Sequence, residues 1–212
     1  MRLRKKHFAI PEMEVNPYIF LRPEELKGKW QDQFKNKRPI HLEIGAGRGG
    51  FAVELARRNP HINYLAMDME SNVFVYAGRR IQEAGLENLY GILGHGENLE
   101  EYFQAEQIER IYINFCNPWP KPRQHKRRLI HPRLLEVYKK VLKPGAEIQV
   151  KTDDLGLYEA GLEYFPEAGF EILESCSDLG LNEDSIVTDY EKKWRGQGIK
   201  IKYIRARFPG KI

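Results

Sequence analysis

The sequence predicts an α/β fold, in which a mostly parallel, doubly wound sheet carries helices on both faces and an antiparallel strand at its C-terminal end. Three observations lead to this prediction. The chain has 212 residues, of which 42% are hydrophobic, and this is enough to bury one core. Strand and helix patterns alternate along most of its length, which is typical of parallel sheets. The first strand pattern ends in a glycine-rich turn that opens a helix.

The ends of the individual helices and strands are predicted from glycine and proline residues, which interrupt regular secondary structure. The first strand stops at the glycine-rich residues 45–50, the helix after it ends near Asn59-Pro60, and the next helix ends at Gly85. Strands are expected at 39–44, 62–68, 89–93, 108–115, 146–152, 170–176 and 199–208. Helices are expected at 51–58, 73–84, 132–142 and 155–168. We expect residues 1–38 to form an N-terminal arm and helix, and residues 39–212 to form a single domain.

The charge distribution indicates a polyanionic partner. Net charge is only +4, but residues 2–6 carry +4, and residues 121–143 and 192–212 carry +8 each. The rest of the chain is therefore strongly acidic. Basic segments on an acidic body are typical of proteins that bind nucleic acid. The N-terminal and C-terminal basic segments either extend this surface or are ordinary solvated faces.

Several classes of protein are unlikely on composition. No apolar run approaches the ~20 residues that span a bilayer, and the apolar stretch after the basic start is too short for a signal peptide. The two cysteines, Cys116 and Cys176, form no pair with metal-ligand spacing. We therefore expect a cytoplasmic protein without membrane or metal partners.

The glycine-rich turn predicts a cofactor site. Gly45, Gly47 and Gly50 satisfy the dinucleotide fingerprint, and Asp68 follows where a ribose-binding acid belongs. A nicotinamide cofactor is therefore one candidate. Glu43 opposes it, because a carboxylate two residues before the first glycine would repel a pyrophosphate. S-adenosylmethionine has no phosphate and carries two positive groups, so the same carboxylate favours it.

A second motif spans residues 114–121 and ends the fourth strand with two prolines around Trp119. Proline fixes φ and extends the residue before it, so this loop is stiff and can hold a side chain beside a flat base. For Trp119 alone, burial in the core is the simpler expectation. The basic residues that follow it are Lys121, Arg123, Lys126, Arg127 and Arg128. Their position after this loop favours phosphate contacts.

Taken together, the motifs resemble the bacterial tRNA (guanine-N7-)-methyltransferase family over nearly the full length. The resemblance rests on Arg2-Leu3-Arg4, Gly28-Lys29-Trp30, residues 40–45, the Pro-Trp-Pro-Lys block with Arg127-Arg128, Lys151-Thr152-Asp153 and Thr188-Asp189-Tyr190-Glu191. It implies a Rossmann-like class I methyltransferase fold. It also implies methyl transfer from S-adenosylmethionine to a guanosine in the tRNA variable loop, conventionally position 46.

The resemblance also assigns residues to roles. For the cofactor it implies Glu43, Asp68, His95 and Asn117, to which we add Gly45, Gly47 and Glu97. For the substrate it implies Lys121, Asp153 and the segment Thr188, Asp189, Tyr190 and Glu191, to which we add Arg127 and Arg128. The expected catalytic residues are Asn117 and Asp153.

Two residues depart from the family pattern. Asn117 stands where the family usually has a presumed catalytic aspartate, and His95 stands where it usually has another aspartate. Guanine N7 carries a lone pair and no proton, so the reaction needs placement and a suitable field rather than a general base. Our hypothesis is that Asn117 orients cofactor and base, while Asp153 or Glu97 supplies negative charge.

Three other functions remain open. Asn117-Pro118-Trp119 is similar to the Asn-Pro-Pro-aromatic motif of methyltransferases that act on exocyclic amino groups. A nicotinamide oxidoreductase is a less favoured alternative, and a non-enzymatic RNA-binding protein with a vestigial pocket is the third. The sequence leaves open whether the protein is a monomer or a homodimer.

Overall fold

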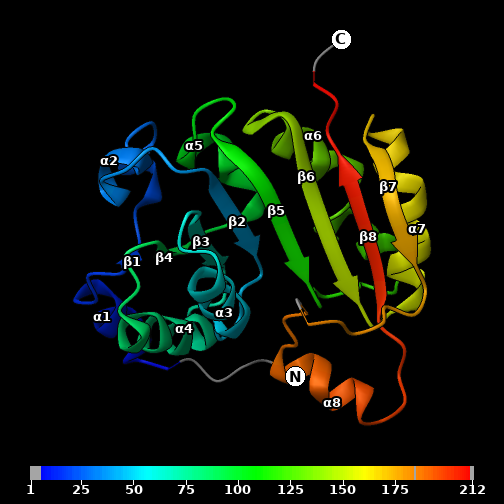
Figure 1. Cartoon of the computed structure of the whole chain (residues 1–212), viewed down its shortest axis with the longest axis horizontal. Helices are drawn as coiled ribbons and strands as arrows, with labels where there is room; N and C mark the ends of the chain where they lie inside the picture. Colours follow the sequence, from blue (N-terminus) through cyan, green and yellow to red (C-terminus); the bar gives the residue numbers. More distant parts are fainter. Residues whose placement is uncertain (1–5, 184, 211–212) are drawn as a thin grey trace. The chain divides into compact units, whose positions relative to one another are not determined.

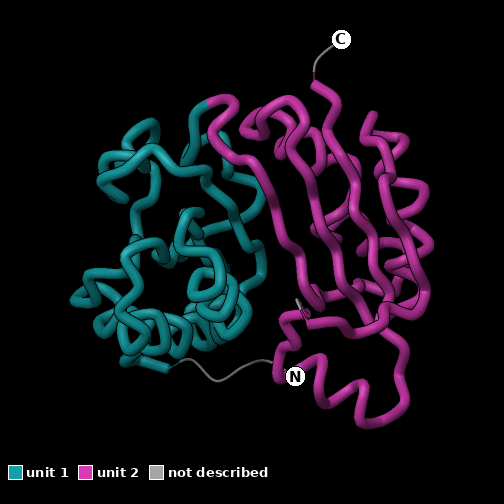
Figure 2. The backbone as a smooth tube through the Cα atoms, in the orientation of Figure 1, with its two compact units in different colours: residues 1–104 teal, residues 105–212 magenta. Residues whose placement is uncertain are grey.

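The computed structural model describes residues 6–183 and 185–210, and it divides into two compact units (Figure 2). The first unit comprises Met1–Gln104 and the second Ala105–Ile212. Each unit carries four strands and several helices, and each is described by itself below.

In the first unit the strands lie in the order β1-β4-β3-β2, and every neighbouring pair is parallel (Figure 1). The strands are β1 (Ile19–Phe20), β2 (Ile40–Ile44), β3 (Asn63–Asp68) and β4 (Leu89–Leu93). The helices are α1 (Ala9–Glu14), α2 (Trp30–Phe34), α3 (Gly50–Arg58), α4 (Ser71–Ala84) and α5 (Leu99–Tyr102), with short 3-10 helices η1 (Pro23–Leu26) and η2 (Gly96–Asn98). Because parallel strands are buried on both faces, they consist of nearly continuous apolar runs. All five residues of β2 are buried, which explains why its sequence pattern was clear.

The N-terminal residues are part of this unit's core. Trp30 is fully buried, and its Nε1 donates to the carbonyl oxygen of Tyr102 at 2.9 Å. Strand β1 pairs with β4 through Ile19 and Gly91. A Cβ on Gly91 would lie 2.4 Å from Ile19 Cδ1, so this pairing needs glycine there. The sequence predicted an arm and a helix in this region but not β1, because two residues are too few to show a period.

In the second unit the strands lie in the order β5-β6-β8-β7. They are β5 (Ile108–Asn114), β6 (Leu142–Thr152), β7 (Glu171–Cys176) and β8 (Lys202–Arg207). The helices are α6 (Pro132–Lys139), α7 (Leu155–Glu167) and α8 (Asp189–Arg195), with the 3-10 helix η3 (Pro122–Arg127). Strands β5 and β6 are parallel, whereas β8 runs antiparallel to both β6 and β7. The predicted antiparallel C-terminal strand is confirmed.

Three predicted boundaries in the second unit were wrong. The helix expected at 132–142 ends at Lys139, β6 begins at Leu142 instead of 146, and β8 begins at Lys202 instead of 199. Strand β6 runs through Pro144-Gly145 because Leu142 pairs with Ile108 before the register shifts, and because the Gly145 N–H donates to the carbonyl oxygen of Phe208. Helix α8 was not predicted, and Figure 1 shows it beyond the carboxyl ends of β5 and β6. Within the described ranges, no helix has the length and apolar character needed to cross a membrane.

Candidate functional site

The glycine loop of the first unit follows β2 and adopts a conformation that requires glycine. Gly45, Gly47 and Gly49 have φ values of 83°, 56° and 72°, in the left-handed region that other residues avoid. The N–H of Gly45 donates to the carbonyl oxygen of Met67 at 2.8 Å, which ties the loop to β3. The carboxylate of Glu43, one residue before the end of β2, is only 5% exposed. The loop therefore starts beside a buried carboxyl group.

Asp68, the last residue of β3, fixes the same loop. Its Oδ2 accepts from the N–H of Gly47 at 2.8 Å, and its Oδ1 accepts from the N–H of Glu70 at 2.8 Å. Burial raises the pKa of this carboxyl above its usual 3.8, although backbone N–H donors oppose the effect. Asp68 thus couples the glycine loop to the start of α4, and three backbone N–H donors leave the carboxylate with capacity for a ligand.

The residues after β4 complete this part of the chain. The N–H of His95 is directed at the hydroxyl of Tyr102 at 3.4 Å, while the side chains of His95 and Glu97 are exposed. Gly94 is needed because a Cβ there would lie 2.9 Å from the Tyr102 ring. The ends of β2, β3 and β4 therefore bring together the predicted cofactor residues of this unit.

The donor set of this glycine-loop site fits S-adenosylmethionine. A buried carboxylate suits a positively charged group, and a second carboxylate at the end of the next strand suits ribose hydroxyls. A Cβ added to Gly47 would meet nothing within 4 Å, so there is open space beside the loop. A pyrophosphate would instead be placed next to the Glu43 carboxylate.

In the second unit, the loop after β5 is held in an unusual backbone conformation. Phe115 and Trp119 have φ values of 52° and 45°, and the Oδ1 of Asn117 accepts from the N–H of Trp119 at 3.1 Å. Asparagine supplies the oxygen needed for this turn as well as aspartate would. Asn117 therefore holds the shape of the loop without placing a charge there.

The basic residues after this loop fall into two groups. Lys121 and Arg127 are exposed, and the Arg127 guanidinium lies 5.1 Å from the centre of the Trp119 ring. Trp119 is half-buried rather than in the core, so the expectation of core burial was wrong. Arg128 differs from its neighbours because it is only 4% exposed and its Nε donates to the Pro118 carbonyl oxygen at 2.8 Å. Arg128 therefore stabilises the loop through this buried hydrogen bond.

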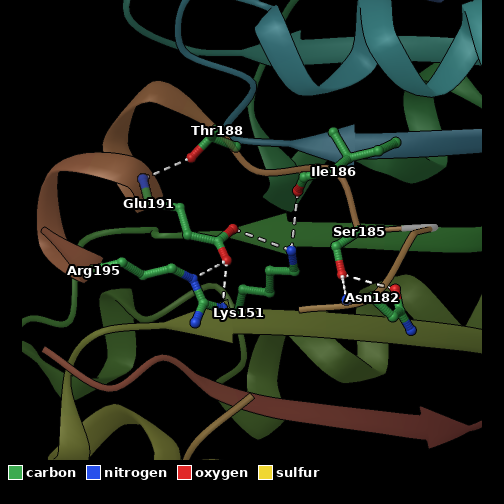
Figure 3. A network of polar contacts seen from close by, with 7 residues as sticks. All are labelled: Lys151, Asn182, Ser185, Ile186, Thr188, Glu191 and Arg195. Carbon is green, nitrogen blue, oxygen red and sulfur yellow. Dashed lines mark hydrogen bonds and ion pairs between the residues drawn. The ribbon is translucent and has the colours of Figure 1, made fainter. Parts of the chain in front are cut away.

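A buried ion-pair network anchors α8 (Figure 3). Glu191 is 0% exposed, and its Oε2 lies 3.2 Å from the Nζ of Lys151. Its Oε1 accepts from Nε and Nη2 of Arg195 at 2.9 and 2.7 Å. Lys151 also donates to the carbonyl oxygen of Ile186 at 3.1 Å, and the Oγ1 of Thr188 accepts from the N–H of Glu191 at 3.0 Å as the helix N-cap. One cation from β6 and one from α8 thus pair with the same buried carboxylate.

The same helix places Tyr190 near Phe115 and near the predicted site residue Asp153. Its ring centre lies 5.1 Å from that of Phe115. Burial and, after it, the nearby Asp153 carboxylate raise the pKa of the Tyr190 phenol. The structure therefore brings Lys151, Asp153 and the segment 188–191 together with the loop after β5. Arg195 and Phe115 also belong to this cluster. They were not predicted as site residues, because nothing in the sequence around them shows that they contact Glu191 and Tyr190.

Comparison with known proteins gives a full-length match. A family model described as "Putative methyltransferase" matches residues 37–204. A tRNA (guanine-N(7)-)-methyltransferase from Clostridium tetani (strain Massachusetts / E88) is 47% identical over 209 residues, which cover 98% of this chain and 99% of that protein. The chain belongs to the tRNA (guanine-N(7)-)-methyltransferase family. The resemblance seen in the sequence is confirmed.

Solved structures confirm the fold of this methyltransferase. The 16S rRNA methyltransferase KamB is 14% identical and has a TM-score of 0.65, with 85% of this chain and 93% of that chain covered. A SAM-dependent methyltransferase from Aquifex aeolicus is 15% identical and has a TM-score of 0.58, with coverage of 96% and 100%. Both are similar in fold alone, and the fold is the predicted class I arrangement.

Two observations narrow the chemistry available to this methyltransferase. Burial raises the pKa of the Cys116 thiol to about 12, so the thiol beside Asn117 stays protonated near neutral pH and is a poor nucleophile. Across residues 6–183 and 185–210, no group of three or more His, Cys, Asp or Glu side chains could hold a metal ion. Cys116 is therefore unsuited to act as a nucleophile in this loop.

The raised pKa of Asp68 predicts a pH-dependent cofactor affinity. Ribose hydroxyls donate to the ionised carboxylate, so affinity for S-adenosylmethionine should fall as pH drops through this pKa, which lies above 3.8. Asp68→Asn should lose this acidic step and bind about 10-fold or more weakly at pH 7, as expected for one charge-assisted hydrogen bond. Titration calorimetry across mildly acidic to neutral pH measures both effects. If the pH dependence of affinity in Asp68→Asn matched that of the wild type, the placement of Asp68 in the cofactor site would be contradicted.

The same pKa makes a prediction for stability without cofactor. Because folding raises the pKa of Asp68, the ionised form is disfavoured in the folded state. Its contribution to the free energy of unfolding is therefore most favourable below pH 3.8 and is lost as pH rises through the folded pKa. Asp68→Asn should flatten this part of the stability curve. Urea unfolding at several pH values measures it, and a curve as steep as that of the wild type would refute the prediction.

The buried network predicts that α8 depends on Glu191. Removing one partner of a buried ion pair costs about 3–5 kcal/mol, so Glu191→Gln should lower hydrogen-exchange protection of residues 189–195 by roughly 100-fold or more. Glu171→Gln is the matched control, because it breaks an exposed pair with Arg207 in the same unit and should cost about 0–1 kcal/mol. Equal protection in both variants would show that the network does not hold the helix.

Proposed function

We propose that this protein transfers the methyl group of S-adenosylmethionine to N7 of a guanosine in the tRNA variable loop, conventionally position 46. The observation that carries the proposal is the 47% identity with the C. tetani tRNA (guanine-N(7)-)-methyltransferase over 98% of this chain. The glycine-loop site supports it, because its carboxylates suit a cationic methyl donor. The enzyme is placed in the cytoplasm, where it acts as a monomer or a homodimer.

The reaction asks for placement more than for acid–base chemistry. S-adenosylmethionine supplies a methyl group on a positively charged sulfur, and the in-plane lone pair of guanine N7 attacks it. N7 carries no proton, so no side chain has to remove one. Holding two reactants in near-attack geometry lowers a barrier by about 7–11 kcal/mol. The protein's task is to fix the reactants and to stabilise the positive charge that develops on the base.

On this proposal, the first unit holds the cofactor. Glu43 attracts a positively charged group, and Gly45 and Gly47 allow close approach of the backbone. Asp68 accepts from ribose hydroxyls while it keeps the loop in place through Gly47. His95 and Glu97 follow β4 and contact the adenine end. Because the His95 N–H is directed at Tyr102, the exposed imidazole is the group of His95 available for contact.

In the second unit, Asn117 and Asp153 act on the base. The Oδ1 of Asn117 is engaged by the Trp119 N–H, so its amide nitrogen is free to donate to cofactor or base. Asp153 provides negative charge near Tyr190 and favours the cationic product. Glu97 is the alternative source of that charge. This division explains how the enzyme works with asparagine at position 117.

The substrate residues divide into those that touch RNA and those that position others. Lys121 and Arg127 are exposed and bind phosphates, with the Trp119 ring beside Arg127. Asp189 and Tyr190 are exposed on α8 and contact the nucleoside. Thr188 and Glu191 act by holding α8, because one caps the helix and the other is buried between cations. Arg128 is likewise a positioning residue for the loop after β5.

Methylation of an exocyclic amino group remains the second candidate, because Asn117-Pro118-Trp119 is similar to the motif of those enzymes. One experiment separates the functions. The protein is incubated with S-adenosylmethionine and unmodified tRNA, and the product is digested to nucleosides for mass spectrometry and mapped by fragment. We expect 7-methylguanosine from the variable loop. An N2-methylated or N6-methylated nucleoside supports the second candidate, and RNA binding without product would refute both.

The charge hypothesis predicts the result of two conservative substitutions. If Asp153 or Glu97 stabilises the product cation, then Asp153→Asn or Glu97→Gln should slow single-turnover methylation by about 10-fold or more. Glu171→Gln, on the β7 edge, serves as the control. If both variants methylate at the single-turnover rate of Glu171→Gln, the negative charge at these positions plays no part in the chemical step.

The two neighbouring arginines should behave differently. Arg127→Gln should weaken tRNA binding and reduce the slope of log K against log salt by about 0.7–0.9, the value of one phosphate contact. Arg128→Gln should leave that slope near the wild-type value. It should lower thermal stability and turnover, because the loop loses the hydrogen bond from Arg128 to the Pro118 carbonyl oxygen. Filter binding from low to moderate salt, with melting curves, measures both. A slope change in Arg128→Gln equal to that in Arg127→Gln would overturn the distinction.

A further inference from the structure

Three cations converge on Tyr76 of α4 in the first unit. The Nζ of Lys6 donates to the Tyr76 hydroxyl at 2.8 Å and lies 4.2 Å from the centre of its ring. The guanidinium groups of Arg48 and Arg79 lie 5.3 and 5.2 Å from the same ring centre. We call these four residues the Tyr76 cluster. None of them was assigned a role by the motifs.

The charge of the Tyr76 cluster is only partly balanced. Glu12 pairs with Arg79 through both carboxylate oxygens, at 2.5 and 2.7 Å. Within the described part of the chain, no carboxylate lies within ion-pair distance of Lys6 or Arg48. Lys6 and Arg48 therefore add two positive charges around one ring. An anion bound beside the ring would be attracted by both charges.

The position of the cluster points to the substrate rather than the cofactor. Arg48 directly follows Gly47, whose N–H is bound to Asp68, so the cluster adjoins the glycine-loop site within one unit. S-adenosylmethionine carries one anionic group, its carboxylate, beside two positive groups, whereas tRNA carries one negative charge per nucleotide. A phosphodiester therefore gains more from these cations, and an aromatic ring flanked by guanidinium groups also suits RNA.

The cluster also holds Lys6, the last residue of the basic segment 2–6, in place. The backbone N–H of Lys6 donates to the Oδ1 of Asn72 at 2.7 Å, and its Nζ donates to the carbonyl oxygen of Asn72 at 3.0 Å. Lys6 is thus tied to the first turn of α4. Arg2, Arg4 and Lys5 precede it in the sequence and lie outside the described residues.

We propose that the Tyr76 cluster is a second RNA-binding surface, which takes phosphodiesters of the tRNA through Lys6 and Arg48, in addition to the basic residues after the β5 loop. The inference rests on the proposed function, because it takes tRNA as the substrate. The Tyr76 hydroxyl orients the ammonium of Lys6 by accepting a hydrogen bond from it, and the ring faces the two arginines. Arg79 is held in place by Glu12 and contributes least to the excess charge.

The test compares the salt dependence of tRNA binding among matched variants. Arg48→Gln and Lys6→Gln should each reduce the slope of log K against log salt by about 0.7–0.9, and the double variant by about twice that. Arg57→Gln is the control, because Arg57 is an exposed arginine of α3 that pairs with Glu54. It should keep the wild-type slope. Affinity for S-adenosylmethionine should stay within twofold in every variant.

Two outcomes would overturn the proposal. One is a slope for Arg48→Gln and Lys6→Gln equal to that of Arg57→Gln. The other is a parallel loss of S-adenosylmethionine affinity, which would mean that the substitutions disturb the glycine loop instead of RNA contacts. The wild-type protein separates this inference from the proposed function. If it forms 7-methylguanosine while the variant slopes are unchanged, only the Tyr76 cluster is refuted.

Discussion

The buried carboxylate of Glu43 is the constraint on which the cofactor assignment depends. A carboxylate at 5% exposure is costly unless its surroundings favour the charged form, so its position beside a ligand loop restricts the ligand. The glycine loop by itself satisfies a dinucleotide pattern, and Asp68 lies where a ribose-binding acid belongs. Glu43 resolves the ambiguity, because a negative charge next to the loop favours a cationic methyl donor over a pyrophosphate.

Charge segregation within each unit extends the same reasoning. In the first unit, Asp68 holds the glycine loop and the start of α4 with one carboxylate, while cations gather on the outer side of α4 around Tyr76. In the second unit, exposed cations follow the loop after β5, and a buried carboxylate holds α8. A methyl donor that is positive and an acceptor that is polyanionic need binding groups of opposite sign. The modest net charge of +4 results from these opposing sets.

The sequence predicted those features that depend on repeated patterns of apolar residues. Strand β4 was predicted at its observed bounds, and β2, β3 and α3 to within a residue, because buried parallel strands and amphipathic helices have clear periods. Strand β1 was missed because it has two residues, and α8 because its polar sequence has no apolar stripe. Burial of charged residues was the other failure. Nothing in the motifs indicated that Arg128 and Glu191 would be buried while Arg127 and Asp189 would be exposed, since that difference arises from tertiary contacts.

Calorimetric binding of S-adenosylmethionine to the wild-type protein and to Glu43→Gln tests the central claim most directly. The substitution keeps the size of the side chain and one acceptor oxygen, replaces the other oxygen by an NH2 group and removes the charge. The account predicts that wild type binds S-adenosylmethionine but not NADPH. It also predicts that Glu43→Gln binds S-adenosylmethionine about 10-fold to 100-fold more weakly, the loss of one charge-assisted contact. Equal affinity in both proteins, or binding of NADPH by the wild type, would contradict it.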